Sequence, residues 1–318
     1  MTPAPPGPAA PPVVFLMGPT GAGKTDLAVQ LVERLGCGIV SVDSALVYRG
    51  MDIGTAKPGP EVLARAPHRL IDLRDPRESY SAAEFRRDAL DAILAVRREG
   101  RLPLLVGGTG LYFRALERGL SALPPADPEV RRRLAEEGRA HGWPALHARL
   151  AALDPPAAAR IHANDPQRIQ RALEVRELTG RPMSELLTQS PGSVLPYRVV
   201  KVVLEPVDRA ALHARIEARF RAMLEAGLVA EVERLRSRGD LSPDLPSMRA
   251  VGYRQVWAFL AGATDRETLV ARAVAATRGL AKRQLTWLRG ESGALRVDPF
   301  APGAVDLVLG FLARQSLS

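Results

Sequence analysis

One segment of the chain combines glycines, a lysine and a threonine in a spacing that could bind phosphate. It occupies residues 18–25, follows a strongly apolar run and precedes a helix-like segment. Gly18 and Gly23 let the backbone curl so that successive N–H groups point at an anion, and Lys24 adds a full positive charge. Thr25, the first hydroxyl after the lysine, is placed to ligate an accompanying Mg²⁺ ion. This segment, called the phosphate loop below, predicts a site for a di- or triphosphate.

Asp43 is a second residue that could do chemistry. It follows the β-branched run 38–42, which predicts a strand parallel to the one before the phosphate loop. Parallel strands deliver such a residue to the carboxyl edge of the sheet, where ligands bind. Its position allows two roles, that of a Mg²⁺ ligand or turn cap and that of a catalytic carboxylate beside the phosphate. Both roles remain open at this point.

Two further strand ends add candidates at the same edge. The apolar run 102–106 leads into a double glycine and Thr109, so the backbone can approach a ligand closely and a hydroxyl is at hand. The run 69–73 is predicted as another strand. Its Asp72 is either a carboxylate that binds Mg²⁺ or a residue that caps the strand end.

The elements that must position these residues alternate between strand and helix at first. Ser81 and Glu84 form a capping-box pattern that predicts a helix to about Arg98. From about residue 120 the pattern becomes helical only, with helices that start at Asp127-Pro128 and Asp165-Pro166. The predicted organisation is a tail at 1–12, a core of 13–120 with 197–318, and an inserted helical domain at 121–196.

The second half of the core is predicted to begin with a fifth strand, 197–204. Helices follow, and among them 247–255 and 278–289 mix cations with aromatic residues as RNA-facing surfaces do. In the insert, Arg168 and Arg171 share one helical face. They are either lid or RNA contacts or part of a solvated face. Trp257 and Trp287 are expected to be core residues.

Composition narrows the class of protein. The chain has 44 Lys and Arg against 35 Asp and Glu, a formal net charge of +9, which suggests a polyanionic partner. A single cysteine, Cys37, excludes an internal disulfide and suits a reducing cytoplasm, where we expect it to fill core space. Residues 2–12 have the composition of a disordered tail and not of a secretion signal. No apolar run is long enough to span a membrane.

Together and in this order, these motifs resemble those of the bacterial-type tRNA dimethylallyltransferases, also called tRNA isopentenyltransferases. We expect no zinc-finger extension of the eukaryotic type. The matching pieces are the phosphate loop, Asp43-Ser44 with Val47-Tyr48, and the segments 51–58, 107–112, 165–175, 251–255 and 282–287. The resemblance implies an α/β fold, a P-loop NTPase-like parallel sheet flanked by helices with an inserted all-helical domain. It also implies transfer of a dimethylallyl group from dimethylallyl diphosphate to N6 of the adenosine just 3′ of a tRNA anticodon.

The resemblance also assigns site residues. It makes Asp43 the general base and places Thr20, Lys24 and Thr109 at the reacting centre. The prenyl diphosphate is held by Gly18, Pro19, Thr20, Gly21, Ala22, Gly23, Lys24 and Thr25, with Mg²⁺ at Thr25. Positions that match contacts to the tRNA anticodon stem-loop are Asp43, Ser44, Ala45, Leu46, Thr109, Arg131, Gln167, Arg168, Ile169, Gln170, Arg171, Arg249, Ala250, Val251, Gly252, Tyr253, Arg254, Lys282, Arg283, Gln284, Leu285, Thr286 and Trp287. Leu46 departs from the family, because many relatives carry glutamine there.

Two other classes fit part of the sequence. An ATP-dependent small-molecule kinase would explain the phosphate loop and the insert, but not the basic C-terminal helices. A non-catalytic, nucleotide-switched RNA-binding protein would need an acidic strand end that senses the nucleotide, for which Asp72 is the candidate. We expect neither a membrane association nor an obligatory protein partner.

Overall fold

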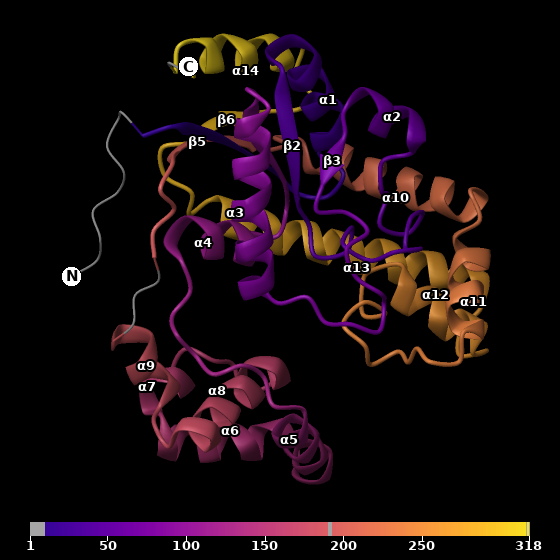
Figure 1. Ribbon diagram of the computed structural model, residues 1–318. Coiled ribbons are helices and arrows are strands. Elements are labelled where there is room, and N and C mark those ends of the chain that lie inside the picture. Colours follow the sequence, from indigo (N-terminus) through magenta and orange to yellow (C-terminus); the bar gives the residue numbers. More distant parts are fainter. Residues whose placement is uncertain (1–9, 190–192, 316, 318) are drawn as a thin grey trace. The chain divides into compact units, whose positions relative to one another are not determined.

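The chain folds into two compact units. The computed structural model describes residues 10–189, 193–315 and 317. Of these, residues 10–117 and those from 195 onward form a sheet unit, and residues from 118 to 194 form a helical unit (Figure 1). Residues 1–9 of the predicted tail lie outside the described residues. The predicted tail boundary at residue 12 is wrong, because Pro12 already belongs to the first strand.

A parallel sheet forms the centre of the sheet unit. Over the described residues it has six strands in the order β3-β2-β4-β1-β5-β6, and every neighbouring pair is parallel. This architecture confirms the predicted parallel α/β sheet. The strands are β1 (Pro12–Met17), β2 (Cys37–Val42), β3 (His68–Arg69), β4 (Leu102–Gly107), β5 (Arg198–Leu204) and β6 (Leu295–Val297).

Two of these strands differ from the prediction. The strand predicted at 69–73 is wrong in extent, since β3 ends at Arg69. Leu70 and Asp72 take left-handed backbone angles, with φ of 65° and 55°, which no strand tolerates. β6 went unpredicted because three residues are too few to show an alternating pattern.

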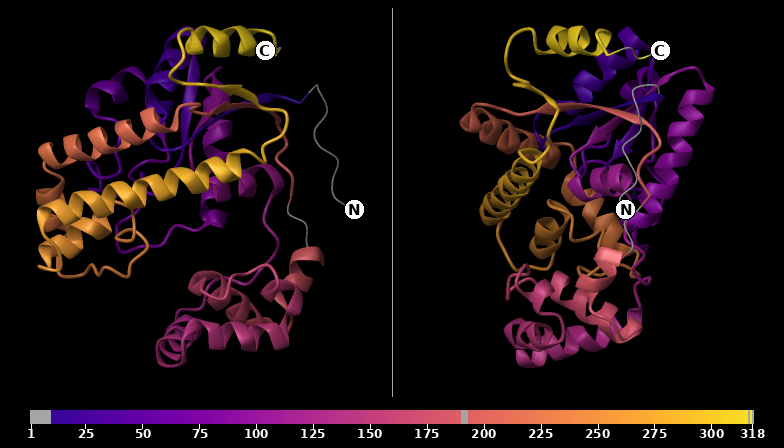
Figure 2. Two further views of the ribbon diagram at one scale, coloured as in Figure 1. Left: turned by 180° about the vertical axis from the view of Figure 1, so that it is seen from behind. Right: turned by 90° about the vertical axis from the view of Figure 1, so that its left-hand side faces the viewer.

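Helices cover both faces of the sheet. Alternate residues of β1 pack on opposite sides, Val14 and Leu16 in one hydrophobic core and Phe15 and Met17 in the other. On the first side lie α1 and α14, and on the second lie α3, α4 and α10 to α13 (Figure 2). The helices of this unit are α1 (Lys24–Leu35), α2 (Pro60–Arg65), α3 (Ala82–Arg98), α4 (Gly110–Arg118), α10 (Arg209–Glu225), α11 (Leu228–Ser237), α12 (Tyr253–Leu260), α13 (Arg266–Leu288) and α14 (Ala304–Ala313).

Of two helices predicted in the sheet unit, one has the predicted start and the other does not. The amide of Ser81 donates to the Glu84 carboxylate at 2.8 Å and the amide of Glu84 donates to the Ser81 hydroxyl at 3.2 Å, so the predicted capping box at the start of α3 is confirmed. The helix predicted at 247–255 is wrong in its first half. Gly252, with φ of 96°, ends a run of turns, and α12 begins at Tyr253.

The helical unit has its own small core. Its helices are α5 (Pro128–His141), α6 (Trp143–Leu153), α7 (Pro155–Ala158), α8 (Pro166–Thr179) and α9 (Met183–Gln189). Leu134, Leu150 and Leu173 from α5, α6 and α8 meet in that core. The side chains of Asp127 and Asp165 accept backbone N–H groups at the starts of α5 and α8, which confirms both predicted helix starts. In the described part of the chain, no helix combines the length and the apolar character that crossing a bilayer requires.

Candidate active site: an anion-binding cavity in the sheet unit

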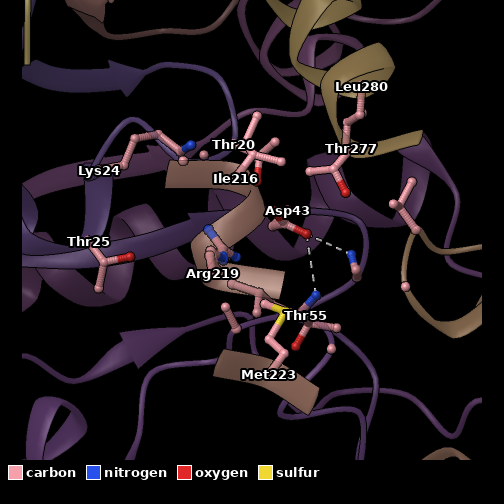
Figure 3. A pocket seen from close by; sticks show the side chains of 18 of the residues that line it. Thr20, Lys24, Thr25, Asp43, Thr55, Ile216, Arg219, Met223, Thr277 and Leu280 are labelled. Carbon is pink, nitrogen blue, oxygen red and sulfur yellow. Dashed lines mark hydrogen bonds between the residues drawn. The ribbon is translucent and has the colours of Figure 1, made fainter. Parts of the chain in front are cut away.

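A cavity of about 670 Å³ opens at the carboxyl ends of the central strands. The phosphate loop and Asp43 line it from the sheet side, and α10 and α13 line it from the helix side (Figure 3). Figure 2 shows these two helices lying side by side. Segments 54–58 and 250–252 complete its wall. The cavity therefore lies at the carboxyl edge of the sheet, where the sequence predicted that a ligand would bind.

The glycines of the phosphate loop serve different purposes. Gly21 and Gly23 have φ of 83° and 76°, so the loop's curl depends on this pair. Gly18 lacks such an angle, and our expectation that it lets the backbone curl is wrong. A Cβ on Gly18 would lie 3.0 Å from the Cβ of Leu204, so glycine is needed there for close approach to β5.

Gln284 connects the phosphate loop to the loop after β4. Its side-chain oxygen accepts the Thr20 amide at 2.9 Å, and its side-chain nitrogen donates to the Gly108 carbonyl at 3.1 Å. One turn further along α13, the ring of Trp287 stacks on Phe113 with centroids 5.9 Å apart. That ring also covers Gly110, where a Cβ would come within 2.4 Å of it. Helix α13 is thus fixed against the two loops that face the cavity.

Asp43 points into the cavity and also shapes its own turn. One carboxylate oxygen accepts the amide of Ala45 at 2.8 Å and that of Leu46 at 3.4 Å, the contacts drawn in Figure 3. Thr109 supports the same turn, because its hydroxyl oxygen accepts the amide of Ser44 at 3.3 Å. The turn-capping role and a chemical role are therefore compatible. One oxygen holds the turn and the carboxylate still lines the cavity.

Two cations face Asp43. Burial lowers the pKa of the Lys24 ammonium to about 8, although the Asp43 carboxylate raises it, and Arg219 lowers it further. Burial also holds the pKa of the Arg219 guanidinium below its ordinary value, opposed by Asp43. Within the described residues neither cation forms an ion pair, and the Lys24 ammonium donates only to the Pro19 carbonyl, at 2.8 Å. Half-buried cations without a partner carboxylate favour an anionic ligand in the cavity.

The rest of the helix side is mostly apolar. Ile216, Phe220 and Met223 follow one another at helical spacing along α10, and Leu280 faces the cavity from α13. Figure 3 shows Ile216, Met223 and Leu280 around the cavity together with Arg219. A ligand with an anionic head and a small hydrocarbon group would match both parts of this wall.

The residues present fit a magnesium ion only in a site shared with a ligand. Among the described residues, no group of three or more His, Cys, Asp or Glu side chains could hold a metal. Mg²⁺ is usually bound by one or two carboxylates together with substrate phosphates. The Thr25 hydroxyl and the Asp43 carboxylate line the same cavity and suit that arrangement. Asp72 does not line it and instead pairs with Lys57.

The other predicted site residues fall into four groups. Gly18, Pro19 and Ala22 lie buried within the phosphate loop, and Tyr253 and Leu285 are buried in the core. At the surface of the sheet unit lie Ser44, Arg249, Arg254, Lys282, Arg283 and Thr286, while Ala45, Leu46, Ala250, Val251 and Gly252 line the cavity. Arg131, Gln167, Arg168, Ile169, Gln170 and Arg171 belong to the helical unit, where Ile169 is buried.

Sequence reasoning missed Arg215 and Arg219. Both line the cavity from α10, one helical turn apart, and the Arg215 guanidinium donates to the Gly21 carbonyl at 3.3 Å. The same helix also carries Arg209 and Arg221, so arginine content could not mark the relevant pair. The only local signal is the shared spacing of these two arginines with Ile216 and Phe220.

Comparisons with known proteins identify the family of the chain. A family model described as IPP transferase matches residues 46–291. The tRNA dimethylallyltransferase of Thioalkalivibrio sulfidiphilus is 64% identical over 302 residues, which cover 94% of this chain and 94% of that protein. The tRNA dimethylallyltransferase of Nitrosococcus oceani is 61% identical and covers 91% of this chain and 92% of its own.

Solved structures of lower sequence identity are also similar to this chain. The tRNA isopentenylpyrophosphate transferase of Bacillus halodurans is 37% identical with a TM-score of 0.68, and the match covers 95% of this chain and 96% of that one. A eukaryotic dimethylallyltransferase acting on tRNA has a TM-score of 0.75 at 24% identity, a likeness of fold alone. The relatives named here support the prenyltransferase interpretation and give no support to the kinase. The chain belongs to the IPP transferase family, whose members named here are tRNA dimethylallyltransferases.

Proposed function

We propose that this protein transfers a dimethylallyl group from dimethylallyl diphosphate to N6 of the adenosine immediately 3′ of the anticodon in tRNA, with release of diphosphate. The observation that carries this proposal is that one cavity combines an apolar wall with two cations that form no ion pair among the described residues. Lys24 and Arg219 suit the diphosphate, and the apolar side chains of Ile216, Phe220 and Met223 suit a five-carbon group.

The reaction needs a base and a stabilised leaving group. A bond forms between adenine N6 and C1 of the prenyl group, and the bond between C1 and the diphosphate oxygen breaks. Adenine N6 is a poor nucleophile because its lone pair is delocalised into the ring, so Asp43 takes the N6 proton as N6 attacks. Lys24, Arg219 and the amides of the phosphate loop stabilise the charge that develops on the departing diphosphate.

A magnesium ion fits this scheme as a partner of the diphosphate. Thr25 would hold it, and when bound it would add positive charge at the leaving group. The adenine must leave its stack to reach the cavity, so the enzyme acts on an extruded base. Exposed cations such as Arg249, Arg254 and Lys282 would contact the RNA backbone. We place the reaction in the cytoplasm, which suits the single, buried Cys37.

The test is a direct product analysis. The protein is incubated with tRNA and dimethylallyl diphosphate, and the anticodon-loop nucleosides are then weighed by mass spectrometry. We expect one adenosine to gain a dimethylallyl group and an equal amount of diphosphate to appear. A parallel reaction with ATP in place of the prenyl donor controls for kinase activity. Robust ADP formation without nucleoside modification would refute the proposal.

A further inference from the structure

Glu231 of α11 is a buried carboxylate that binds backbone instead of a cation. It is 2% exposed, and among the described residues no lysine or arginine pairs with it. One of its oxygens accepts the amides of Asp52 at 3.0 Å and Ile53 at 2.8 Å, and the other accepts the amide of Gly54 at 3.2 Å. Three successive N–H groups therefore form an anion-binding concavity that a side chain of the same protein fills.

Tyr253 completes this arrangement from the first residue of α12. Its hydroxyl donates to Glu231 at 2.5 Å, and its side chain is fully buried. Its ring also dictates the residue at position 54, because a Cβ on Gly54 would lie 2.5 Å from the ring. The resemblance assigned Tyr253 to tRNA contacts. In this structure its side chain faces Glu231 and Gly54 and offers nothing to a partner.

The two segments that Glu231 joins are both walls of the cavity. The loop 51–58 lines it through Gly54, Thr55, Ala56 and Pro58. Residues 250–252, immediately before Tyr253, line it as well. Two segments about 200 positions apart in the chain thus depend on one carboxylate for their relative position.

The remaining contacts of the loop do not replace this carboxylate. Lys57 donates to the Tyr48 carbonyl at 2.9 Å and pairs with Asp52, and Ala56 takes a left-handed φ of 53°. These contacts wind the loop on itself and tie it to the segment just before it, and the ion pair of Lys57 with Asp72 also ties it to the turn after β3. Among the described residues, the only side-chain bonds to the backbone amides of residues 52–54 come from α11. A buried carboxylate carries a large desolvation cost, and an apolar side chain of similar size would pack α11 without it.

We propose that Glu231, together with Tyr253, is a positioning residue that sets the loop 51–58 against residues 250–252 and so fixes the shape of the reaction cavity. Its effect on rate rests on the proposed function. Its effect on the loop does not. The two carboxylate oxygens of Glu231 both accept backbone N–H groups. A carboxamide has only one oxygen, and its NH₂ group cannot accept a hydrogen bond. In either orientation of the carboxamide, at least one backbone bond is therefore lost.

The experiment compares Glu231→Gln with Glu233→Gln, an exposed position on the same helix. Hydrogen exchange is followed by mass spectrometry on peptides that cover residues 49–58 and on peptides that cover β1. In Glu231→Gln we expect faster exchange in the first region only, and single-turnover transfer slowed by about 10²-fold, the cost of a small misplacement in an active site. The affinity and stoichiometry for inorganic diphosphate, which probe the phosphate loop, should stay within about twofold. Glu233→Gln should match wild type throughout.

Other results overturn the proposal. If hydrogen exchange at residues 49–58 does not change, Glu231 contributes only to stability. The same conclusion follows if the transfer rate falls in proportion to the fraction of protein molecules that still bind diphosphate. If Glu231→Gln does not fold, Tyr253→Phe removes only the phenol bond and should give the same regional exchange to a smaller degree, whereas wild-type exchange there would reject the idea. Absence of dimethylallyl transfer by the wild-type protein would refute the proposed function alone, because the exchange comparison still decides the role of Glu231.

Discussion

The cations of the helical unit and those of the cavity differ in whether they form ion pairs. In the helical unit, Arg131 and Arg171 both bind the carboxylate of Glu174, at 2.8 Å and 2.7 Å, and Glu174 is fully buried. Around that centre Arg132, Arg133 and Arg149 also pair with glutamates of the same unit. In the cavity, Lys24 and Arg219 both interact electrostatically with Asp43, and neither forms an ion pair among the described residues.

This difference separates arginines that build a fold from cations that await a ligand. From the sequence, arginines of the helical unit were assigned to tRNA and Lys24 to the diphosphate, whereas Arg219 was not assigned to any ligand. A guanidinium that already satisfies a buried carboxylate cannot be given to phosphate without leaving that carboxylate unpaired. A half-buried cation that faces a cavity gains a partner when an anion arrives. Substitutions in the two regions should therefore have different consequences.

The largest effect is expected at Asp43, the carboxylate that acts on both cavity cations. Asp43→Asn keeps the shape and one acceptor oxygen for the Ala45 amide, but it cannot take the N6 proton at neutral pH. We expect the transfer rate to fall by about 10² to 10⁴ while tRNA and donor still bind. The measurement is a single-turnover rate with both substrates saturating.

A magnesium titration of the same variant separates two roles of Asp43. If Asp43 served only as a ligand to Mg²⁺, excess metal would recover much of the rate. A low rate that does not change over the titration supports a base, and recovery to near the wild-type rate contradicts it. Binding of donor by the variant serves as the control that the cavity is intact.

In the helical unit, the corresponding test is Glu174→Gln. The buried carboxylate also accepts the Asp127 amide at 2.9 Å, and although burial alone would raise its pKa, the bonds from Arg131 and Arg171 lower it. Loss of this centre should cost the unit about 3 to 5 kcal/mol of unfolding free energy. Denaturant unfolding measures it, with the exposed Glu136→Gln as a matched control. Equal stability of both variants would mean that Arg131 and Arg171 are not committed to the fold.

For the cavity cations, Arg219→Gln is compared with Arg221→Gln on the same helix. Arg221 is exposed and pairs with Glu217 at 3.0 Å, so its loss should leave transfer unchanged. Arg219→Gln should slow transfer by about 10² to 10³, the range for one lost group that stabilises charge in a transition state. Similar rates for the two variants would remove Arg219 from the site.

Local signals predicted most of the sheet unit. The apolar runs before Gly18 and Gly107, and the capping box at Ser81, are short-range patterns with one structural solution each. The failures occurred where tertiary contacts decide. Asp72 lies in a left-handed turn and binds Lys57, which propensity alone does not reveal. Residues 247–252 have a helical pattern but form turns before α12.

The sequence predicted those site residues that belong to recognisable motifs. The phosphate loop and Asp43 follow strands and so share an edge by topology. Arg219 and Glu231 lie on helices whose other arginines and glutamates are similar, and only packing selects them. Tyr253 shows the converse, because a motif placed it at the site but its buried hydroxyl donates to Glu231. Gln284 does line the cavity, yet its side-chain hydrogen bonds go to Thr20 and Gly108 of the same protein.

The pKa of Lys24 predicts a smaller effect on donor binding. Because that pKa is about 8, the ammonium is charged at pH 7 and mostly neutral at pH 9. The affinity for dimethylallyl diphosphate should therefore fall by about tenfold as the pH rises from 7 to 9, since only the charged form binds well. Calorimetric titration across this range measures it. The variant Lys24→Met should bind weakly with no such pH dependence, and a wild-type affinity that stays constant would contradict the assignment.

The smallest effect is expected at Arg168, an exposed cation of the helical unit that, unlike Arg131 and Arg171, could bind a ligand. In the described part of the chain it pairs with Asp165 alone, at 3.4 Å and one helical turn away, and a surface pair of this kind contributes little stability. Arg168 is therefore free to meet an RNA phosphate, whereas Arg171 is not. For Arg168→Ala we expect weaker tRNA binding and a salt dependence whose log–log slope falls by about 1, with unfolding unchanged. Arg171→Ala should instead lower the stability of the helical unit. If neither variant changed the salt slope, the helical unit would hold its arginines for its own fold alone, and the cavity would be the only anion site of the two.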